Sequence, residues 1–251
     1  MFHWRIRHAR QRDSRRSETA TAFAPPWRAC GGRRLSAGGG RRRDPAAYGG
    51  GRRLQRRIRR AHYDDGPNPS NTNTLLNALR QNGLRATFFN IGQNAQNNQA
   101  LVRAQRDAGM WIGNHSYTHP HMTSMTTAQM QSEVQRTQQA IQQATGTAPR
   151  LFRPPYGETN ATLRSVEQQM GLTEVLWDVD SQDWNGASTA AIVSAAGRLT
   201  NGQTILMHDQ YATTVQAIPQ IAQNLASRNL CAGMISPPPA VPWPPTAPPP
   251  R

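Results

Sequence analysis

The sequence contains no lysine, only two cysteines and no long apolar run. A membrane-spanning helix needs about 18 or more consecutive apolar residues, so we expect none here. Every basic side chain is an arginine, which indicates a GC-rich coding sequence rather than a function. The cysteines, Cys30 and Cys231, fit one disulfide in a secreted protein or two unrelated thiols, and the sequence leaves both open.

Positive charge is confined to the first 60 residues. They hold 18 of the 29 arginines and 3 of the 14 acidic residues, whereas residues 61–251 hold 11 of each. The net charge of +15 therefore belongs to residues 1–60, and the remainder is neutral. We predict no specific nucleic-acid binding, because a specific reader presents its basic patch on a folded scaffold. A nucleic-acid binder that uses the basic segment alone is a weaker alternative, and its binding would weaken steeply with salt.

Residues 1–60 form an Arg/Gly-rich segment without helical or strand periodicity. Such a segment buries too little apolar surface to offset its chain entropy, so we predict disorder. The arginines continue almost to His62, where a buried strand would need a run of Val, Ile and Leu. One hypothesis is that residues 1 to about 62 are translated out of frame. The alternative is a genuine basic arm.

Residues 61–235 alternate between strand-like and helix-like runs, which predicts one α/β domain with a parallel sheet. Strands are expected at 86–91, 110–113, 151–152, 175–177, 204–207 and 231–235. Helices are expected at 71–82, 99–108 and 126–145, after Asn160, after Ser188 and around Val215. Thr126 with Gln129 forms a capping-box pattern, and Gly146 ends that helix. The proline-rich residues 236–251 are predicted to be a tail or linker.

Polar side chains recur where the predicted strands end: Asp64 and Asp65, His115 and His119, Arg153, Asp183, and His208. In a parallel α/β barrel these ends share one rim, where the active site is built. A carboxylate and two imidazoles can hold a divalent metal, and a second carboxylate can act as a base on water. Taken singly, each motif is also compatible with a turn, a core histidine or a surface ion pair. Those alternatives do not explain why all of them fall at strand ends, so we predict a metal-dependent hydrolase.

Five stretches of the sequence then carry a family resemblance: residues 63–67, 115–119, 153–157, 183–184 and 206–208. In this order they resemble the motifs of polysaccharide deacetylases of the NodB type, carbohydrate esterase family 4. The flanking residues 114–123 and 177–184 most resemble secreted actinobacterial acetylxylan esterases. The resemblance implies a distorted (β/α) barrel.

The resemblance also implies a role for each site residue. Asp65, His115 and His119 would bind the divalent metal, zinc or else cobalt. Asp64 would be the general base on the attacking water, oriented by Arg153. His208, held in its charged form by Asp183, would protonate the leaving group. The backbone N–H of Tyr156 would stabilise the oxyanion, and Trp184 and Leu206 would line the acetyl pocket.

For the whole chain, the resemblance implies a secreted, monomeric esterase that removes O-acetyl groups from xylan, although no signal peptide is readable in residues 1–60. An N-deacetylase of chitin oligosaccharides or peptidoglycan is the first alternative, and a catalytically silent cell-wall carbohydrate-binding protein is another. Secreted members of the family often pair a cysteine near the first strand with one near the last. Cys231 fits the second place, whereas Cys30 lies farther before Asp64 than the first place.

Overall fold

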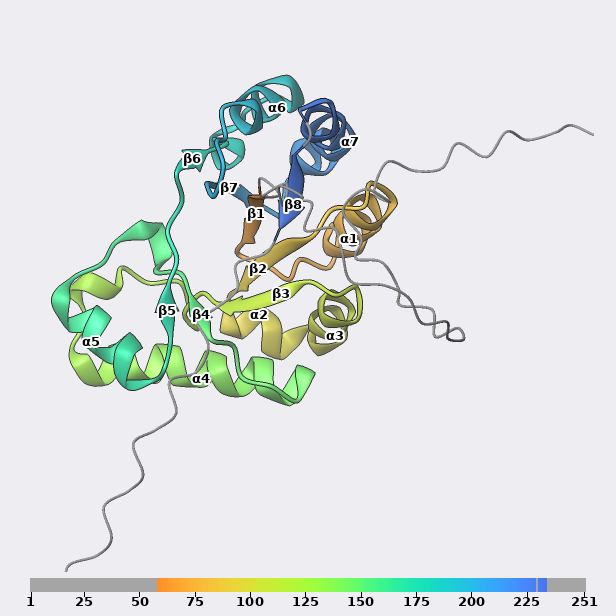
Figure 1. Ribbon diagram of the computed structural model, residues 1–251. Helices are drawn as coiled ribbons and strands as arrows, with labels where there is room; N and C mark the ends of the chain where they lie inside the picture. Colours follow the sequence, from red (N-terminus) through yellow and green to blue (C-terminus); the bar gives the residue numbers. More distant parts are fainter. Residues whose placement is uncertain (1–57, 229, 234–251) are drawn as a thin grey trace, which may run out of the picture.

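A computed structural model of the chain describes residues 58–228 and 230–233. Every strand pairing in this part is parallel, and the pairings give the order β5-β4-β3-β2-β1-β7-β6, with β8 also against β1. The helices lie around the outside of the curved sheet (Figure 1). Among the described residues no pairing joins the end strands β5 and β6, so the barrel is incomplete there. The fold is therefore the distorted (β/α) barrel that the sequence predicts.

The strands are short, as expected for a small barrel: β1 (Ile58–Asp64), β2 (Ala86–Asn90), β3 (Trp111–Asn114), β4 (Leu151–Phe152), β5 (Thr173–Glu174), β6 (Val179–Asp180), β7 (Thr204–His208) and β8 (Cys231–Gly233). The helices are α1 (Thr72–Gln81), α2 (Gly92–Asn97), α3 (Gln99–Asp107), α4 (Thr127–Thr145), α5 (Ala161–Gln169), α6 (Thr189–Gly197) and α7 (Ala212–Ser227). Three short 3-10 turns, η2 (Met122–Ser124), η3 (Pro155–Gly157) and η4 (Asp183–Asn185), lie in the loops.

Local capping signals fix three of the helix starts. Thr126 and Gln129 form the predicted capping box at the start of α4, and Gly146 ends that helix with a left-handed φ of 80°. Asn160 and Ser188 each accept a backbone N–H of the first turn, from Leu163 in α5 and from Ala191 in α6. These predictions are confirmed because a cap depends only on residues within one helical turn.

One expectation about the elements is wrong, and one element was not predicted. Residues 175–177 do not form a strand. The carbonyls of Val175 and Leu176 accept hydrogen bonds from the Arg153 side chain, although the N–H of Val175 still donates to the carbonyl of Phe152 in β4. The sheet is formed on either side of them, by β5 and β6. Residues 92–97, for which no helix is predicted, form α2.

The arginine-bearing approach to Asp64 forms the central strand β1, in spite of its composition. Its carboxyl-terminal half pairs with β2 and β7, and residues 58–60 pair with β8. Arg60 is accommodated at the amino-terminal end, where its guanidinium donates to the carbonyl of Gly202 and stays partly exposed. An arginine is tolerated at this end because its head group reaches a polar partner at the barrel surface.

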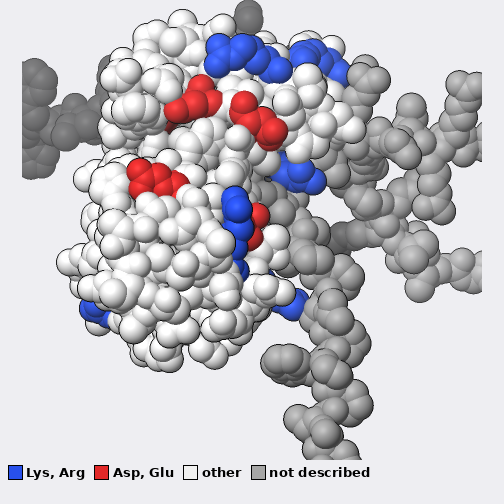
Figure 2. All heavy atoms as spheres, turned by 90° about the vertical axis from the view of Figure 1, so that its left-hand side faces the viewer, with Lys and Arg blue, Asp and Glu red and all other residues white. Residues whose placement is uncertain are grey.

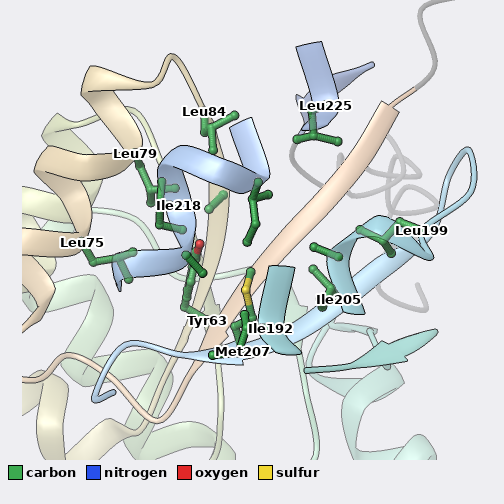
Figure 3. Close-up of a cluster of buried hydrophobic side chains, with 14 of the residues drawn as sticks. Tyr63, Leu75, Leu79, Leu84, Ile192, Leu199, Ile205, Met207, Ile218 and Leu225 are labelled. Atoms are coloured by element: carbon green, nitrogen blue, oxygen red, sulfur yellow. The ribbon is translucent and has the colours of Figure 1, made fainter. Parts of the chain in front are cut away.

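Tyr63 points away from the site, into the main apolar cluster between the sheet and helices α1, α6 and α7 (Figure 3). This cluster includes Leu75 and Leu79 of α1, Ile205 and Met207 of β7, and Ile218 of α7. On the same strand, His62 and Asp64 have the opposite orientation, and both contact Arg153. The alternation along β1 therefore divides the strand between core and site.

Several predictions concern residues outside the described part of the chain. These are the disordered segment, the frame hypothesis as far as residue 57, the proline-rich tail and the cysteine pairing. Within residues 58–228 and 230–233, no helix combines the length and the apolar character that crossing a membrane requires.

Candidate metal centre

The predicted site residues meet at the carboxyl-terminal rim of the sheet. Asp64 is the last residue of β1 and His208 the last of β7, and His115 and Arg153 directly follow β3 and β4. Asp183 lies in η4, three residues after β6. Parallel strands that end at the same level bring these side chains together although their positions in the sequence are far apart.

Asp65, His115 and His119 form a cluster whose potential ligand atoms all lie within 4.8 Å of one another. Asp65 Oδ1 is 3.5 Å from His115 Nε2 and 3.4 Å from His119 Nε2. Two of these residues have left-handed backbones, with φ of 67° at Asp65 and 61° at His119. That conformation costs about 1 kcal/mol or more in a residue other than glycine. The surrounding structure therefore maintains this convergence against a local backbone cost.

The hydrogen bonds of the cluster fit a bound cation. His115 Nδ1 is 2.7 Å from the carbonyl oxygen of Arg153, so it carries the hydrogen that it donates there. In the neutral ring Nε2 is then the acceptor, and it faces another acceptor, Asp65 Oδ1. Asp65 Oδ1 is also buried without a hydrogen-bond partner. A divalent metal between these atoms satisfies all of them, and a backbone carbonyl that orients a ligand histidine is the usual outer partner.

The charges favour the forms that bind a metal. Burial alone would raise the pKa of Asp65, but the neighbouring histidines, His115 first, lower it to about 2. Burial and the neighbouring His115 lower the pKa of His119, which favours its neutral, ligating form. The residues present therefore fit a divalent metal with an Asp, His, His ligand set.

Asp64 lies beside this cluster and is hydrogen-bonded to the side chain of Arg153. It is 2 % exposed, its Oδ1 accepts a hydrogen bond of 2.9 Å from Arg153 Nη1, and its Oδ2 is 3.7 Å from His115 Nε2. Arg153 is itself fully buried and also donates to the carbonyls of Val175 and Leu176 and to His62 Nδ1. Arg153 thus fixes one carboxylate oxygen of Asp64, and the other oxygen faces His115.

His208 and Asp183 form a second pair on the same rim. His208 Nδ1 is 2.7 Å from Asp183 Oδ1, and His208 Nε2 is 3.9 Å from Asp65 Oδ2. Burial would lower the pKa of His208, but the hydrogen bond and charge of Asp183 raise it. Asp183 in turn is held by Thr214, whose hydroxyl donates to Oδ2 at 2.6 Å. Nε2 of a charged His208 is therefore directed toward the cluster.

The structure gives the surroundings of the three residues predicted to bind substrate. Tyr156 lies in η3 with a left-handed φ of 59°, and its ring packs edge-on against His119 and face-on against His121. Trp184 is half exposed and donates from Nε1 to Asp180. Leu206 is buried in β7, between His62 and Asp180 of the neighbouring strands. Their roles stay predictions.

The sequence interpretation missed two residues that support the site. Glu133 of α4 is buried and accepts from the backbone N–H of Tyr117 and of Thr118, in the loop between His115 and His119. The burial of Glu133 could have been predicted from the sequence, because Met130 and Val134 mark the inner face of the same helix. His62 is fully buried and contacts Arg153. The sequence holds no local signal for this contact.

Residues 58–175 match the family model described as polysaccharide deacetylase. A family 4 carbohydrate esterase from Streptomyces lividans, solved in complex with acetate, is similar in structure, with a TM-score of 0.70 and 69 % sequence identity. The alignment covers 71 % of this chain and 93 % of that one.

Two curated proteins are also similar to this chain. One is a bifunctional xylanase/xylan deacetylase of Cellvibrio japonicus, 57 % identical over 177 residues, which are 70 % of this chain and 26 % of that protein. The other is the peptidoglycan-N-acetylmuramic acid deacetylase PdaC of Bacillus subtilis, 38 % identical over 168 residues, which are 66 % of this chain and 35 % of that protein. This chain thus spans only a part of either relative.

Proposed function

Because the chain belongs to the polysaccharide deacetylase family, we propose that it is a metal-dependent esterase that removes O-acetyl groups from xylan. One observation carries this proposal. The Asp65, His115, His119 cluster is flanked by a carboxylate tied to a buried arginine and by a histidine tied to a buried carboxylate. This arrangement provides a ligand set, a base and an acid for acyl transfer to water.

Asp65, His115 and His119 are the residues that would hold the metal, and zinc suits their nitrogen and carboxylate ligands, with cobalt as the second choice. A bound divalent cation supplies a Lewis acid that polarises the acetyl carbonyl and makes water more acidic. Asp64 takes the proton of the attacking water with Oδ2, while Arg153 keeps Oδ1 in place. The water oxygen then forms the new bond to the acetyl carbon.

The leaving group needs a proton, because an alkoxide is a poor leaving group at neutral pH. His208 is placed to give this proton from Nε2, and Asp183 stabilises the charged ring beforehand. The acetyl C–O bond to the sugar breaks as its oxygen takes the proton. In our proposal the backbone N–H of Tyr156 bonds to the oxyanion, and Trp184 and Leu206 surround the acetyl methyl group.

The surface supports a neutral polysaccharide as substrate. Figure 2 shows that, over the described residues of this face, arginines and acidic side chains are scattered on a mostly uncharged surface. Xylan is too large to enter a cell, so the proposal includes action outside the cell. Acetate-releasing activity in the medium of producing cells would support this point, and activity confined to the cell interior would contradict it.

The amide-cleaving alternative is kept because PdaC, a peptidoglycan deacetylase, is 38 % identical over 66 % of this chain. The test measures acetate release from acetylated xylan and from N-acetylglucosamine hexamers at equal acetyl concentration. We expect kcat/KM at least about 10-fold higher on xylan, and we expect chelator to abolish the activity and added zinc or cobalt to restore it. A preference for the hexamers would favour the N-deacetylase, and no acetate from either polymer in restored enzyme would overturn both proposals.

A further inference from the structure

A buried histidine with no role in the proposed reaction lies next to the arginine that holds the base. His62 is the third residue from the end of β1, is 0 % exposed, and its Nδ1 contacts Nη2 of Arg153. A guanidinium has no acceptor atom, so in this contact Arg153 donates and His62 Nδ1 accepts. The ring must therefore carry its hydrogen on Nε2, and Nε2 is buried without a partner.

His62 completes the set of acceptors around Arg153. The guanidinium donates from Nε to Val175 O, from Nη1 to Asp64 Oδ1, and from Nη2 to His62 and Leu176 O. Because the arginine is fully buried, a lost acceptor leaves an N–H that water cannot reach. His62 thus fixes the rotation of the group that positions Asp64.

We propose that His62 is a positioning residue that locks Arg153 onto Asp64, and that this lock fails in acid. The proposal rests on the proposed function for its effect on catalysis, and on geometry alone for its effect on the fold. A second hydrogen on the ring would sit on Nδ1 and point at the donor Nη2. It would also place two positive charges in contact in the interior of the barrel.

The surroundings of His62 offer little compensation for such a charge. The charged groups that face it are Arg153, from the end of β4, and Arg60, on its own strand. Asp64 is the nearby carboxylate, and its Oδ1 is occupied by Arg153. From β2 the edge contact is the ring of Phe89, with the centroids 5.5 Å apart, and the register partners are Thr87 and Leu206, none of which titrates.

The direction of the titration agrees with this geometry. Burial first, and then the charges of Arg153 and Arg60, lower the pKa of His62 well below its usual value. The unfolded chain therefore binds a proton in a pH range where the folded chain does not. Stability contributed by neutral His62 is complete above about pH 6.5, the unfolded value, and is lost as the pH falls below it.

The test compares the full chain with two variants and one control. His62→Asn keeps an acceptor oxygen near the place of Nδ1 but cannot titrate. His62→Leu has a similar size and no acceptor. His121→Asn is the control, because His121 is an exposed histidine with Glu158 as its partner. Unfolding equilibria are measured in chelator between pH 7.5 and pH 5, so that no metal contributes to the change.

We expect the unfolding constant of the natural chain to rise relative to that of His62→Asn by about 10-fold per pH unit below pH 6.5, which is one extra proton bound on unfolding. The control should keep the pH dependence of the natural chain. Parallel curves for the natural chain and His62→Asn would overturn the proposal. These measurements need no substrate, so they remain informative if the proposed esterase activity fails.

The catalytic part of the proposal is tested separately, on metal-loaded enzyme at pH 8. We expect His62→Asn to stay within about 3-fold of the natural kcat. His62→Leu should lose about 10-fold or more in kcat with little change in KM, because it disturbs the base and not the substrate contacts. Full kcat in a folded His62→Leu would contradict the positioning role. If His62→Leu does not fold, ring ¹⁵N spectra of the folded natural chain test the positioning role instead. A His62 Nδ1 that carries a hydrogen at pH 7.5 would overturn that role.

Discussion

Two buried histidines on the neighbouring strands β1 and β7, His62 and His208, have opposite electrostatic surroundings. His208 donates from Nδ1 to the carboxylate of Asp183, and His62 accepts at Nδ1 from the guanidinium of Arg153. Burial disfavours the charged form of both rings. The pKa of His208 is nevertheless raised, because Asp183 outweighs burial, whereas the pKa of His62 is lowered, because Arg153 acts in the same direction as burial.

The difference shows that the charge of the nearest partner decides what a buried histidine can do. A ring paired with a carboxylate can store and release a proton, which suits an acid on the leaving group. A ring paired with an arginine can only accept, which suits a fixed support. The partner thus distinguishes the proposed proton donor, His208 on β7, from the proposed positioning residue, His62 on the neighbouring strand β1.

The largest expected effect on stability and activity comes from replacing Arg153, the partner of His62. In Arg153→Met the carboxylate of Asp64 stays buried and loses its cation. We expect a loss of about 3–5 kcal/mol in the free energy of unfolding and about a 1000-fold loss in kcat. Urea unfolding and acetate release, corrected for the folded fraction, measure the two effects.

Two further variants sharpen that result. Arg153→Lys keeps a charge but not the planar fork of donors, so its loss should be intermediate. Arg164→Met removes an arginine that is largely exposed and 3.4 Å from Glu174, and it should change stability by no more than about 0.5 kcal/mol. If Arg153→Met were as active as the natural enzyme, the link between the base and the buried cation would be refuted.

A smaller effect is expected on the His208 side. Asp183→Asn removes the charge that raises the pKa of His208, so the ring loses its proton at lower pH. Because the proposed acid must be protonated, the alkaline limb of the kcat profile should move to lower pH, and kcat at pH 8 should fall about 100-fold. The profile is measured between pH 6 and pH 10 with saturating metal.

Thr214→Val separates the charge of Asp183 from its orientation. The hydroxyl of Thr214 is one of the donors that hold Asp183 Oδ2, and its loss leaves the carboxylate ionised. We expect a loss of about 10-fold or less in kcat and an unchanged alkaline limb. An alkaline limb that stays in place in Asp183→Asn as well would show that His208 does not supply the proton.

The parts of this site that depend on local sequence patterns could be predicted from the sequence. Apolar strands that stop at a polar residue located His115 and His208, and caps located the starts of α4, α5 and α6. The strand predicted at residues 175–177 is wrong for a reason that no local pattern contains. The carbonyls of Val175 and Leu176 bind the side chain of Arg153, which lies 22 and 23 positions earlier.

His62 could not be predicted for the same physical reason. Its partner Arg153 lies 91 positions later, and the two meet only because β1 is central in the sheet and Arg153 follows β4. An arginine-rich approach to Asp64 also argued against a strand, yet β1 forms by pairing with β2, β7 and β8, and Arg60 at its amino-terminal end reaches the carbonyl of Gly202. Contacts between elements far apart in the sequence thus determine both features, and composition alone does not predict them.

The smallest expected effect concerns Tyr63, which lies between His62 and Asp64 but points into the apolar cluster (Figure 3). Its hydroxyl is buried without a hydrogen-bond partner, and burial raises its pKa. Tyr63→Phe should therefore increase the free energy of unfolding by about 1 kcal/mol and leave kcat unchanged. Tyr117→Phe is the matched control with the opposite sign, because the Tyr117 hydroxyl donates to Gln96. Both are measured by urea unfolding in chelator at pH 7.5, and a Tyr63→Phe variant that loses kcat would show that the core face of β1 is not independent of its site face.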